Sequence, residues 1–347
     1  MANKKSKILV YIIKGGDFSD VTIRFIKNIL VYDKYEFIEI AEEELLNKDT
    51  KDSIVLTTTN QCFTLCDFSI DSKHLFKNFV FNNLKKFNIP HPPVYFGTID
   101  GIGIRVFTIE ERLNSNFSYN SKDNFKIAIR AKQSSNSLGN MIIDKDKLKL
   151  FEDFIISNGD KDITSRTLEE NGFYVENLSN ESCNKLLESL NYRKYYYQRV
   201  LENIENEYRI YWHHGMDENE LDKVIRNLYM VRRHGYSLVQ DKSNVSTNII
   251  PSNEVIEIFK NNHELRKLLH NLIVLFKTNK LLCASADIFT LKKDKNKNSI
   301  TCGCFEYSNE FSMRKSGNKE TILKFYNGIE KALLKTIKNK FNICNTN

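Results

Sequence analysis

The feature that most constrains the fold of this chain is a strand–turn–strand pattern between Leu281 and Ser312. Asp287 opens a run of strand-forming residues, a turn rich in lysine and asparagine follows, and a second run leads to Glu306. Two such runs predict a β-hairpin. If both acids lie on the same face, their carboxylates converge, and paired carboxylates suit Mg²⁺. Taken alone, a surface hairpin whose acids pair with its own lysines is the simpler interpretation.

Further strands and helices alternate ahead of this hairpin, which predicts an α/β fold. Strands are expected over 8–13, 35–40 and 53–57, with an amphipathic helix that begins at Ser19–Asp20. These segments predict a small open α/β unit at the start of the chain. Gly15–Gly16 lies where a phosphate could bind, but the full dinucleotide-binding fingerprint is missing, which favours a structural turn.

The middle of the chain continues the alternation. Helices are expected over 72–87, 108–113, 145–156 and 183–190, and strands over 94–97, 124–130, 141–143, 195–201 and 207–212. Residues 157–180 are polar and are expected to form loops around a short strand. The small polar residues 131–140 could lay backbone N–H groups over phosphates or could form a solvated hairpin tip, and both interpretations stay open.

The rest of the chain carries two further helical patterns around the hairpin and one segment of mixed character. Residues 217–235 predict a helix or a strand that ends in Arg232–Arg233–His234, residues 253–280 a single long helix, and residues 319–340 a final helix with an apolar stripe for packing. The adjacent His213 and His214 point to opposite faces of a strand, which argues against a shared metal ion.

Composition limits the classes of function. The 347 residues are 41% hydrophobic and 27% charged, with a net charge of +7, and these values predict two or three globular domains. The positive excess favours acidic partners such as nucleotides or carboxylates, while the even spread of lysines argues against nucleic acid. Seven cysteines without zinc spacing, and no apolar run long enough for a signal or a membrane span, predict a reduced cytoplasmic protein. Its oligomeric state stays open, a homo-oligomer included.

Taken in order, these segments resemble an ATP-grasp ligase from about Asp71 to the final helix. In the first half, the resemblance is carried by Asp71–Lys77 with Asn88–Pro92 ("DK…K, then GIPxP"), by Phe125–Ala131 ("FPxVVKP") and by the serine- and asparagine-rich loop after it. In the second half, it is carried by the hinge-like Gln198–Leu201, by Glu207–Arg209 ("E/D-x-R"), by Arg232 or Arg233 with Ser243–Ser246 ("N-x-S"), and by Asp287, Glu306 and Asn309 ("D…ExN"). No single motif is specific; the order and the approximate spacing carry the resemblance.

The resemblance implies an ATP-grasp fold of the α/β class in three parts. These are an N-terminal α/β domain over 1–70, a central lobe over 71–196 and a C-terminal lobe over 197–347, with the nucleotide between the two lobes. It also implies that ATP and Mg²⁺ are cofactors and that a substrate carboxylate is activated as an acyl phosphate for attack by an amine. The substrates would be small molecules such as amino acids, or peptides, peptide maturation included.

The resemblance also implies roles for individual residues. Those expected to bind ATP are Lys77, Arg130, Lys132, Ser134, Ser135, Gln198, Val200 and Glu207. Those expected to bind Mg²⁺ are Asp287, Glu306 and Asn309, and those expected at the acyl phosphate are Arg232, Arg233 and Asn244.

Two departures from the family pattern affect these roles. Arg130 stands where the family usually has lysine, with Lys132 two residues on. The asparagine comes one position late, so that Ser308 occupies its usual place: Asn309 reaches the metal through a bend, Ser308 replaces it, or the site is weakened. The alternative to a ligase is therefore a catalytically degenerate ATP-grasp protein that acts as a nucleotide- or peptide-binding module.

Overall fold

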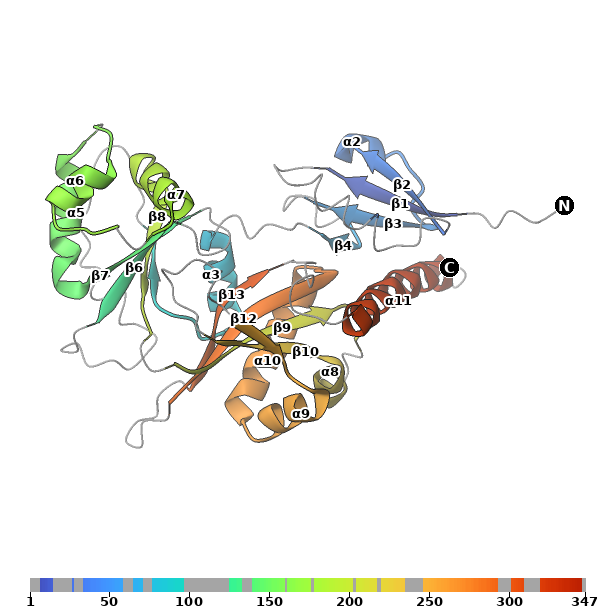
Figure 1. The fold of residues 1–347 in the computed structure, drawn as a ribbon. Helices are drawn as coiled ribbons and strands as arrows, with labels where there is room; N and C mark the ends of the chain where they lie inside the picture. The colour runs from blue at the N-terminus through green and yellow to red at the C-terminus, as the bar shows by residue number, and fades with distance from the viewer. Residues whose placement is uncertain are drawn as a thin grey trace.

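A computed structural model of the chain arranges its strands in three sheets (Figure 1). It describes residues 7–14, 27, 34–58, 65–70, 77–96, 125–132, 139–159, 161–175, 178–201, 204–216, 220–234, 246–292, 301–308 and 319–344. The helix predicted after Ser19–Asp20, the glycine pair Gly15–Gly16 and the helix predicted over 108–113 lie outside these residues. None of the described helices is both long enough and apolar enough to cross a bilayer.

The first sheet is parallel and has the order β2-β1-β3-β4. Its strands are β1 (Ile8–Ile13), β2 (Tyr35–Ile40), β3 (Ser53–Thr57) and β4 (Phe68–Ser69), and the short helix α2 (Glu42–Leu45) follows β2. Every residue of β3 is buried, as expected for an inner strand of a parallel sheet that is covered on both faces. Strands β1, β2 and β3 confirm the three strands predicted from the sequence for this part of the chain.

The second sheet is antiparallel and has the order β5-β8-β6-β7. Its strands are β5 (Val94–Tyr95), β6 (Lys126–Ala131), β7 (Asn140–Asp144) and β8 (Tyr195–Arg199). The turn η1 (Lys145–Lys147) leads into α5 (Leu148–Ser157), and α6 (Ser165–Glu170) and α7 (Asn180–Asn191) follow. The three helices pack on one face of the sheet, where Phe151 and Leu186 share a core with Ile127 and Ile129.

The prediction of a short strand within residues 157–180 was wrong, because α6 lies there. Thr164 caps this helix by accepting a hydrogen bond from the backbone N–H of Thr167, whose side chain bonds back to the backbone of Thr164. This reciprocal cap starts the helix at Ser165, in a segment whose polar composition is typical of a loop.

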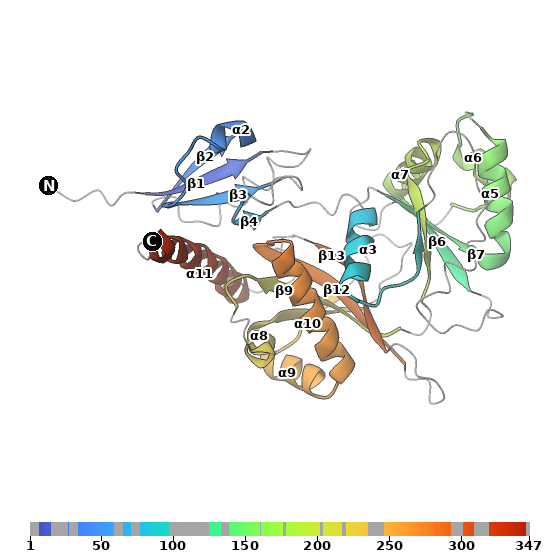
Figure 2. The ribbon, with the colours of Figure 1, turned by 180° about the vertical axis from the view of Figure 1, so that it is seen from behind.

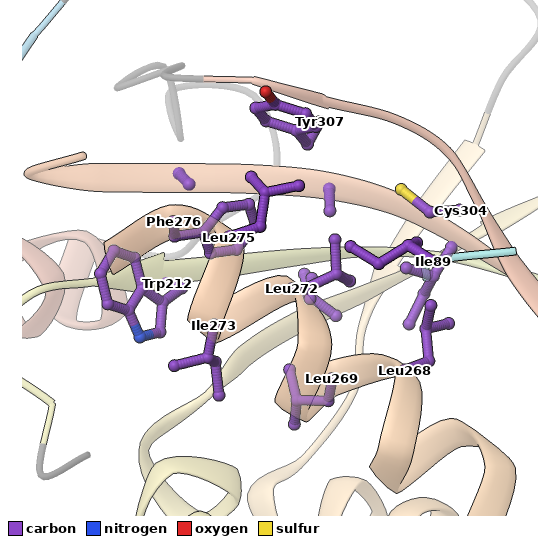
Figure 3. Packing of buried hydrophobic residues seen from close by; sticks show 14 of the residues in the cluster. Ile89, Trp212, Leu268, Leu269, Leu272, Ile273, Leu275, Phe276, Cys304 and Tyr307 are labelled. Atoms are coloured by element: carbon purple, nitrogen blue, oxygen red, sulfur yellow. The ribbon is translucent and has the colours of Figure 1, made fainter. Parts of the chain in front are cut away.

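The third sheet is antiparallel and has the order β11-β10-β9-β12-β13. Its strands are β9 (Ile204–His213), β10 (Tyr229–His234), β11 (Ser246–Ile249), β12 (Cys283–Leu291) and β13 (Cys302–Ser308). Strands β12 and β13 are the hairpin predicted from the sequence. Helices α8 (Leu221–Asn227), α9 (Ser252–Lys260) and α10 (His263–Thr278) cover one face, and Figure 3 shows Leu272 and Phe276 of α10 packed with Trp212 of β9.

The prediction of one long helix over 253–280 was also wrong, because the chain forms α9 and then α10. The side chain of Asn262 accepts a hydrogen bond of 3.0 Å from the backbone N–H of Leu265 and so begins α10 as an N-cap. Residues 217–235 hold both predicted alternatives in turn, a helix (α8) and then a strand (β10).

The last helix, α11 (Lys319–Cys344), packs against both the first and the third sheet. Its apolar stripe, with Phe325, Ile329 and Leu333, shares a core with Val10 of β1 and Tyr211 of β9. The predicted packing role of this stripe is thereby confirmed.

Helix α3 (Lys77–Lys86) lies between the second and third sheets, as both ribbon views show (Figure 2). Its Leu84 belongs to the same core as Tyr196 of β8 and Cys304 of β13. The backbone N–H of Cys304 donates to the carbonyl of Pro90, just after α3, at 2.8 Å. This packing places Lys77, the first described residue of α3, beside β13. The domain limits stay a prediction, and the expected boundary at 196/197 falls within β8.

Candidate active site

Charged side chains gather on the face of the third sheet that packs on α11. Along β9 this face runs from Tyr211, in the core with α11, to Arg209 and Glu207, because alternate residues share a face. The register places Arg209 opposite Asp287 of β12, and Asp287 opposite Glu306 of β13. Arg233 of β10 lies opposite Glu207. We call this face, where it carries the charged residues, the site face.

Asp287 is held by two arginines. Arg209 donates to both of its carboxylate oxygens, Nε to Oδ1 at 2.6 Å and Nη2 to Oδ2 at 2.7 Å. Arg233 donates from Nη1 to Oδ2 at 2.8 Å. Burial alone would raise the pKa of Asp287, but the two guanidinium groups outweigh burial and hold that pKa below its usual value. Asp287 is therefore an ionised, buried carboxylate.

Glu306 pairs with cations from outside the third sheet. The Lys77 ammonium donates to its Oε2 atom, and the Arg130 guanidinium of β6 acts on it through charge. Burial opposes ionisation, but Lys77 and Arg130 together hold the pKa of Glu306 well below its usual range. Lys77 and Arg130 are themselves only 4% exposed, so these charges have little solvent around them. This contact joins the second and third sheets.

Glu207 is the third acid and behaves differently. Arg233 Nη1 lies 3.0 Å from its Oε1 atom, yet that oxygen accepts no hydrogen bond from any described residue. Burial raises the pKa of Glu207 to about 8; Arg233 opposes this and the Asp287 charge adds to it. Near neutral pH Glu207 is mostly protonated, so it contributes little negative charge to the site.

These seven side chains form one charge cluster with a positive excess. It consists of Lys77, Arg130, Arg209, Arg233, Glu207, Asp287 and Glu306. Four cations face two ionised carboxylates and one acid that is mostly protonated. Buried cations in excess of their acids are unfavourable without a further anion. The cluster is therefore suited to an anionic ligand, and guanidinium forks match phosphate oxygens well.

The second sheet adds polar groups to the same region. Arg130 donates to Oε1 of Gln198 and lies over the ring of Tyr196, with 5.7 Å between the guanidinium carbon and the ring centroid. Because a guanidinium only donates, the Gln198 amide must turn its NH₂ group away from Arg130. That Nε2 atom is buried and has no hydrogen-bond partner among the described residues.

An apolar cluster lies beside the charged one. Phe289 follows Asp287 by two residues on the same face of β12, and it packs with Phe305 and with Leu201, which lies between β8 and β9. The centroids of the two phenylalanine rings are 4.5 Å apart. The site face thus combines an apolar end with a cationic end, which matches a ligand with a flat ring system and phosphates.

The structure separates the two arginines that the sequence left as alternatives. Arg233 belongs to the charge cluster. Arg232 lies on the opposite face of β10, where it pairs with Glu254 of α9 at 2.9 Å and lies over the ring of Tyr208. Strand alternation makes this unavoidable for adjacent residues. We therefore leave Arg232 out of the site.

The remaining predicted residues fall into two groups. Val200 donates its backbone N–H to the carbonyl of Lys126 at 2.9 Å, and burial lowers the pKa of Lys132, which follows β6. The others, Ser134, Ser135, Asn244 and Asn309, lie outside the described residues. Sequence reasoning left Arg209 without a role of its own, although its position two residues after Glu207 places both on one face of β9.

The donor set fits Mg²⁺ in part. Glu306 and Asp287 offer the carboxylate oxygens that Mg²⁺ prefers. The Glu306 side chain is 30% exposed and uses Oε2 for Lys77, whereas both oxygens of Asp287 already accept arginine N–H groups. Among the described residues, no three His, Cys, Asp or Glu side chains come together as a metal site. A metal at this place would depend on oxygen atoms of a bound ligand as well.

Comparison with solved structures gives the fold. D-alanine–D-alanine ligase from Bacillus anthracis matches 96% of this chain and 100% of its own, at 13% identity and a TM-score of 0.50. D-alanyl-alanine synthetase A from Vibrio cholerae matches 96% of this chain and 99% of its own, at 12% identity and a TM-score of 0.46. Carboxyaminoimidazole ribonucleotide synthase from Aspergillus clavatus matches 95% of this chain and 77% of its own, at 13% identity and a TM-score of 0.47.

No protein-family model and no curated protein sequence matches this chain. The likeness to the Bacillus anthracis ligase shows a shared fold and, at 13% identity, nothing further. The fold class predicted from the sequence is thereby confirmed.

Proposed function

We propose that this chain, which has the ATP-grasp fold, is an ATP-dependent ligase that activates a carboxylate as an acyl phosphate for attack by an amine. The observation that carries the proposal is the charge cluster. Lys77 and Arg130 come from outside the third sheet and Arg209 and Arg233 from within it, so four cations gather in one cluster that would attract a polyphosphate. The fold neighbour from Bacillus anthracis is named as a D-alanine–D-alanine ligase, which supports a ligase function.

The apolar end of the site face would contact the base of the bound nucleotide. Phe289 and Phe305, with Leu201, offer flat and apolar side chains beside the cations. The buried Nε2–H group of Gln198 would donate to an acceptor atom of the nucleotide. We therefore expect the nucleotide base near Leu201 and Phe289 and the phosphates between Arg130 and Arg233.

Phosphoryl transfer requires positioning of the reactants and charge neutralisation more than covalent catalysis by the protein. Lys77 and Arg130 would hold phosphate oxygens of ATP, and Arg233 would stabilise the negative charge that develops on the transferred phosphoryl group. Bound Mg²⁺, with Glu306 as its protein ligand, would neutralise phosphate charge and polarise the bond that breaks. The amine and the carboxylate would come from amino acids or peptides.

The test combines binding with turnover. Calorimetry with Mg-ATP should show binding, and release of ADP should then appear when mixtures of amino acids or short peptides are supplied. Glu306→Gln should abolish ADP release, because it removes the carboxylate charge that would hold Mg²⁺ at the phosphates. Glu254→Gln is the matched control, since Glu254 pairs with Arg232 on the opposite face of the third sheet.

Two outcomes would contradict parts of the proposal. If Glu306→Gln releases ADP as fast as the unmodified chain, the assignment of the site is wrong. ATP binding without ADP release under any acceptor would favour the alternative, a nucleotide-binding module that has lost catalysis.

A further inference from the structure

We propose that the helix-covered face of the second sheet carries a separate binding site, which takes the ammonium group of an alkylamine between Glu152 and three tyrosines. The three are Tyr95 of β5 and Tyr195 and Tyr197 of β8. Along β8, Tyr195 and Tyr197 face α5, whereas Tyr196, between them, belongs to the core on the other face. The ammonium site therefore lies on the opposite face of the second sheet from the charge cluster, and it goes beyond the proposed ligase function.

The tyrosine rings form one contiguous aromatic surface. Tyr95 lies directly opposite Tyr197 in the register of β5 and β8, and their rings stack with 6.2 Å between centroids. The ring of Tyr195 meets that of Tyr197 edge to face, with centroids 5.6 Å apart. Phe151 of α5 packs edge-on against Tyr195 and Tyr197, with centroids 6.3 and 6.4 Å away, and so holds both rings in place. Tyr197 is buried, whereas Tyr95 and Tyr195 are partly exposed, so a ligand can reach the surface from solvent.

Glu152 follows Phe151 on α5 and brings a carboxylate to these rings. Its charge acts on both Tyr195 and Tyr197, which places the carboxylate close to them. Among the described residues, Glu152 has no hydrogen bond and no ion pair. Burial, with a smaller contribution from the adjacent Asp153, raises the pKa of Glu152 to about 7. A half-buried carboxylate without a cation is unfavourable, and a positively charged ligand would remove this cost.

The chain's own neighbouring cation does not serve this purpose. Arg193 acts on Tyr195 through charge, but its Nη2 atom donates to the backbone carbonyl oxygens of Ile155, at 2.8 Å, and of Gly159, at 2.7 Å. These two hydrogen bonds hold the guanidinium at the end of α5. The carboxylate of Glu152 is left to a cation from outside the chain.

The side chains around Glu152 favour an ammonium group on an alkyl chain over other cations. The faces of tyrosine rings attract cations, one carboxylate supplies one opposite charge, and the rings offer apolar surface to methylene groups. A divalent metal ion would instead require several oxygen ligands. Both a free amine and the lysine side chain of a peptide carry the group that this site fits.

The ionisation of Glu152 makes binding depend on pH. An alkylammonium ion resembles the lysine side chain, whose pKa is about 10.4, so it stays charged up to about pH 8. It binds the ionised form of Glu152, which at a pKa of about 7 grows from about one tenth of the molecules at pH 6 to about nine tenths at pH 8. The other ionisable groups around the site are Asp153, Arg193 and the three tyrosines, and side chains of these types ordinarily titrate outside the range of about pH 6 to 8.

The experiment titrates the full chain with n-butylammonium at constant ionic strength and follows the ring signals of isotope-labelled tyrosines by NMR. The signals of Tyr195 and Tyr197 are assigned by substituting each with phenylalanine. We expect the dissociation constant to be about tenfold lower at pH 8 than at pH 6. Neutral n-butanol should leave these signals unchanged. A blocked tripeptide with a central lysine distinguishes the two sources: equal affinity identifies a peptide lysine as the ligand, and weaker binding identifies a free amine.

Two substitutions on α5 form a matched pair. Glu152→Gln keeps the size of the side chain and removes its charge, so it should weaken n-butylammonium binding at pH 8 by about tenfold and abolish the pH dependence. Asp153→Asn removes the same charge from the next, exposed residue and should bind within about twofold of the unmodified chain at pH 8. Tyr195→Leu removes one ring and should weaken binding by about threefold.

The ammonium site is refuted if the unmodified chain binds n-butylammonium no more tightly than n-butanol, a comparison that needs no variant. It is also refuted if Glu152→Gln and Asp153→Asn bind n-butylammonium equally well, or if the affinity of the unmodified chain is the same at pH 6 and pH 8. The titrations contain no nucleotide, so failure of the proposed ligase function would change none of these results.

Discussion

Lowering the pH from about 7.5 to about 5 should weaken the folded state by about 2 kcal/mol through His213 alone. The ring of His213 lies at the contact between β9 and α11, edge-on to Phe325 with 5.2 Å between ring centroids. It also packs on Gly328, where an added Cβ would lie 2.2 Å from its Cε1 atom. Its Nδ1 atom is buried and has no hydrogen-bond partner among the described residues. Burial, with smaller contributions from the nearby His214 and Lys331, lowers the pKa of His213 to about 4.

The magnitude follows from the difference between the folded and unfolded pKa. In the unfolded chain the imidazole keeps the ordinary pKa of 6.5, so between 6.5 and about 4 the unfolded state binds more protons than the folded state. The contribution of His213 to the unfolding free energy is therefore complete above pH 6.5, and it is lost as the pH falls towards 4. At about 1.4 kcal/mol for each pKa unit, the whole shift amounts to about 3 kcal/mol, of which about 2 kcal/mol is lost by pH 5.

The assay is denaturant unfolding of the unmodified chain and of His213→Asn at both pH values. Other groups titrate in this range, Glu207 among them, so the quantity to compare is the change in unfolding free energy between the two pH values. That change should be about 2 kcal/mol smaller in His213→Asn. His263→Asn, at an exposed histidine of α10, is the control and should behave as the unmodified chain does. An unaltered pH dependence in His213→Asn would refute the reasoning.

Two further substitutions test packing and charge. Asp287→Asn should lower the unfolding free energy by about 3–5 kcal/mol, because Arg209 and Arg233 lose the negative charge of Asp287. In thermal melts, tripolyphosphate should raise the melting temperature of this variant more than that of the unmodified chain. Gly328→Ala should lower the melting temperature, since the clash with His213, about 1–3 kcal/mol, exceeds the gain of about 1 kcal/mol in helix propensity; a higher melting temperature would show that α11 can shift away from β9.

Much of the fold was predictable from local patterns. The hairpin of β12 and β13 followed from two strand-like runs around a polar turn, and its register brings Asp287 opposite Glu306 as expected. The error over 253–280 had a local cause as well. Both halves of that segment have helical periodicity, and the interruption depends on the cap that Asn262 provides, a single hydrogen bond that periodicity does not register.

The partners of the acids could not be predicted in the same way. Which arginine meets Asp287 depends on the register between β9, β10 and β12, and a shift of one residue would exchange Arg233 for Arg232. The state of Glu207 depends on burial by distant parts of the chain, which raises its pKa to about 8 although two arginines are near it in sequence or space. Sequence motifs name the residue types of a site, whereas register and burial decide their charges and contacts.

The charge cluster also explains why the site needs both sheets. Asp287 pairs with Arg209 and Arg233 within the third sheet, but Glu306 depends on Lys77 of α3 and on Arg130 of the second sheet. Under the proposed function, a polyphosphate between the sheets would attract cations from both sides and so strengthen the contact between the second and third sheets. We therefore propose that the ion pairs hold the two sheets together until a phosphate takes the place of a carboxylate and a metal ion takes the place of a cationic side chain.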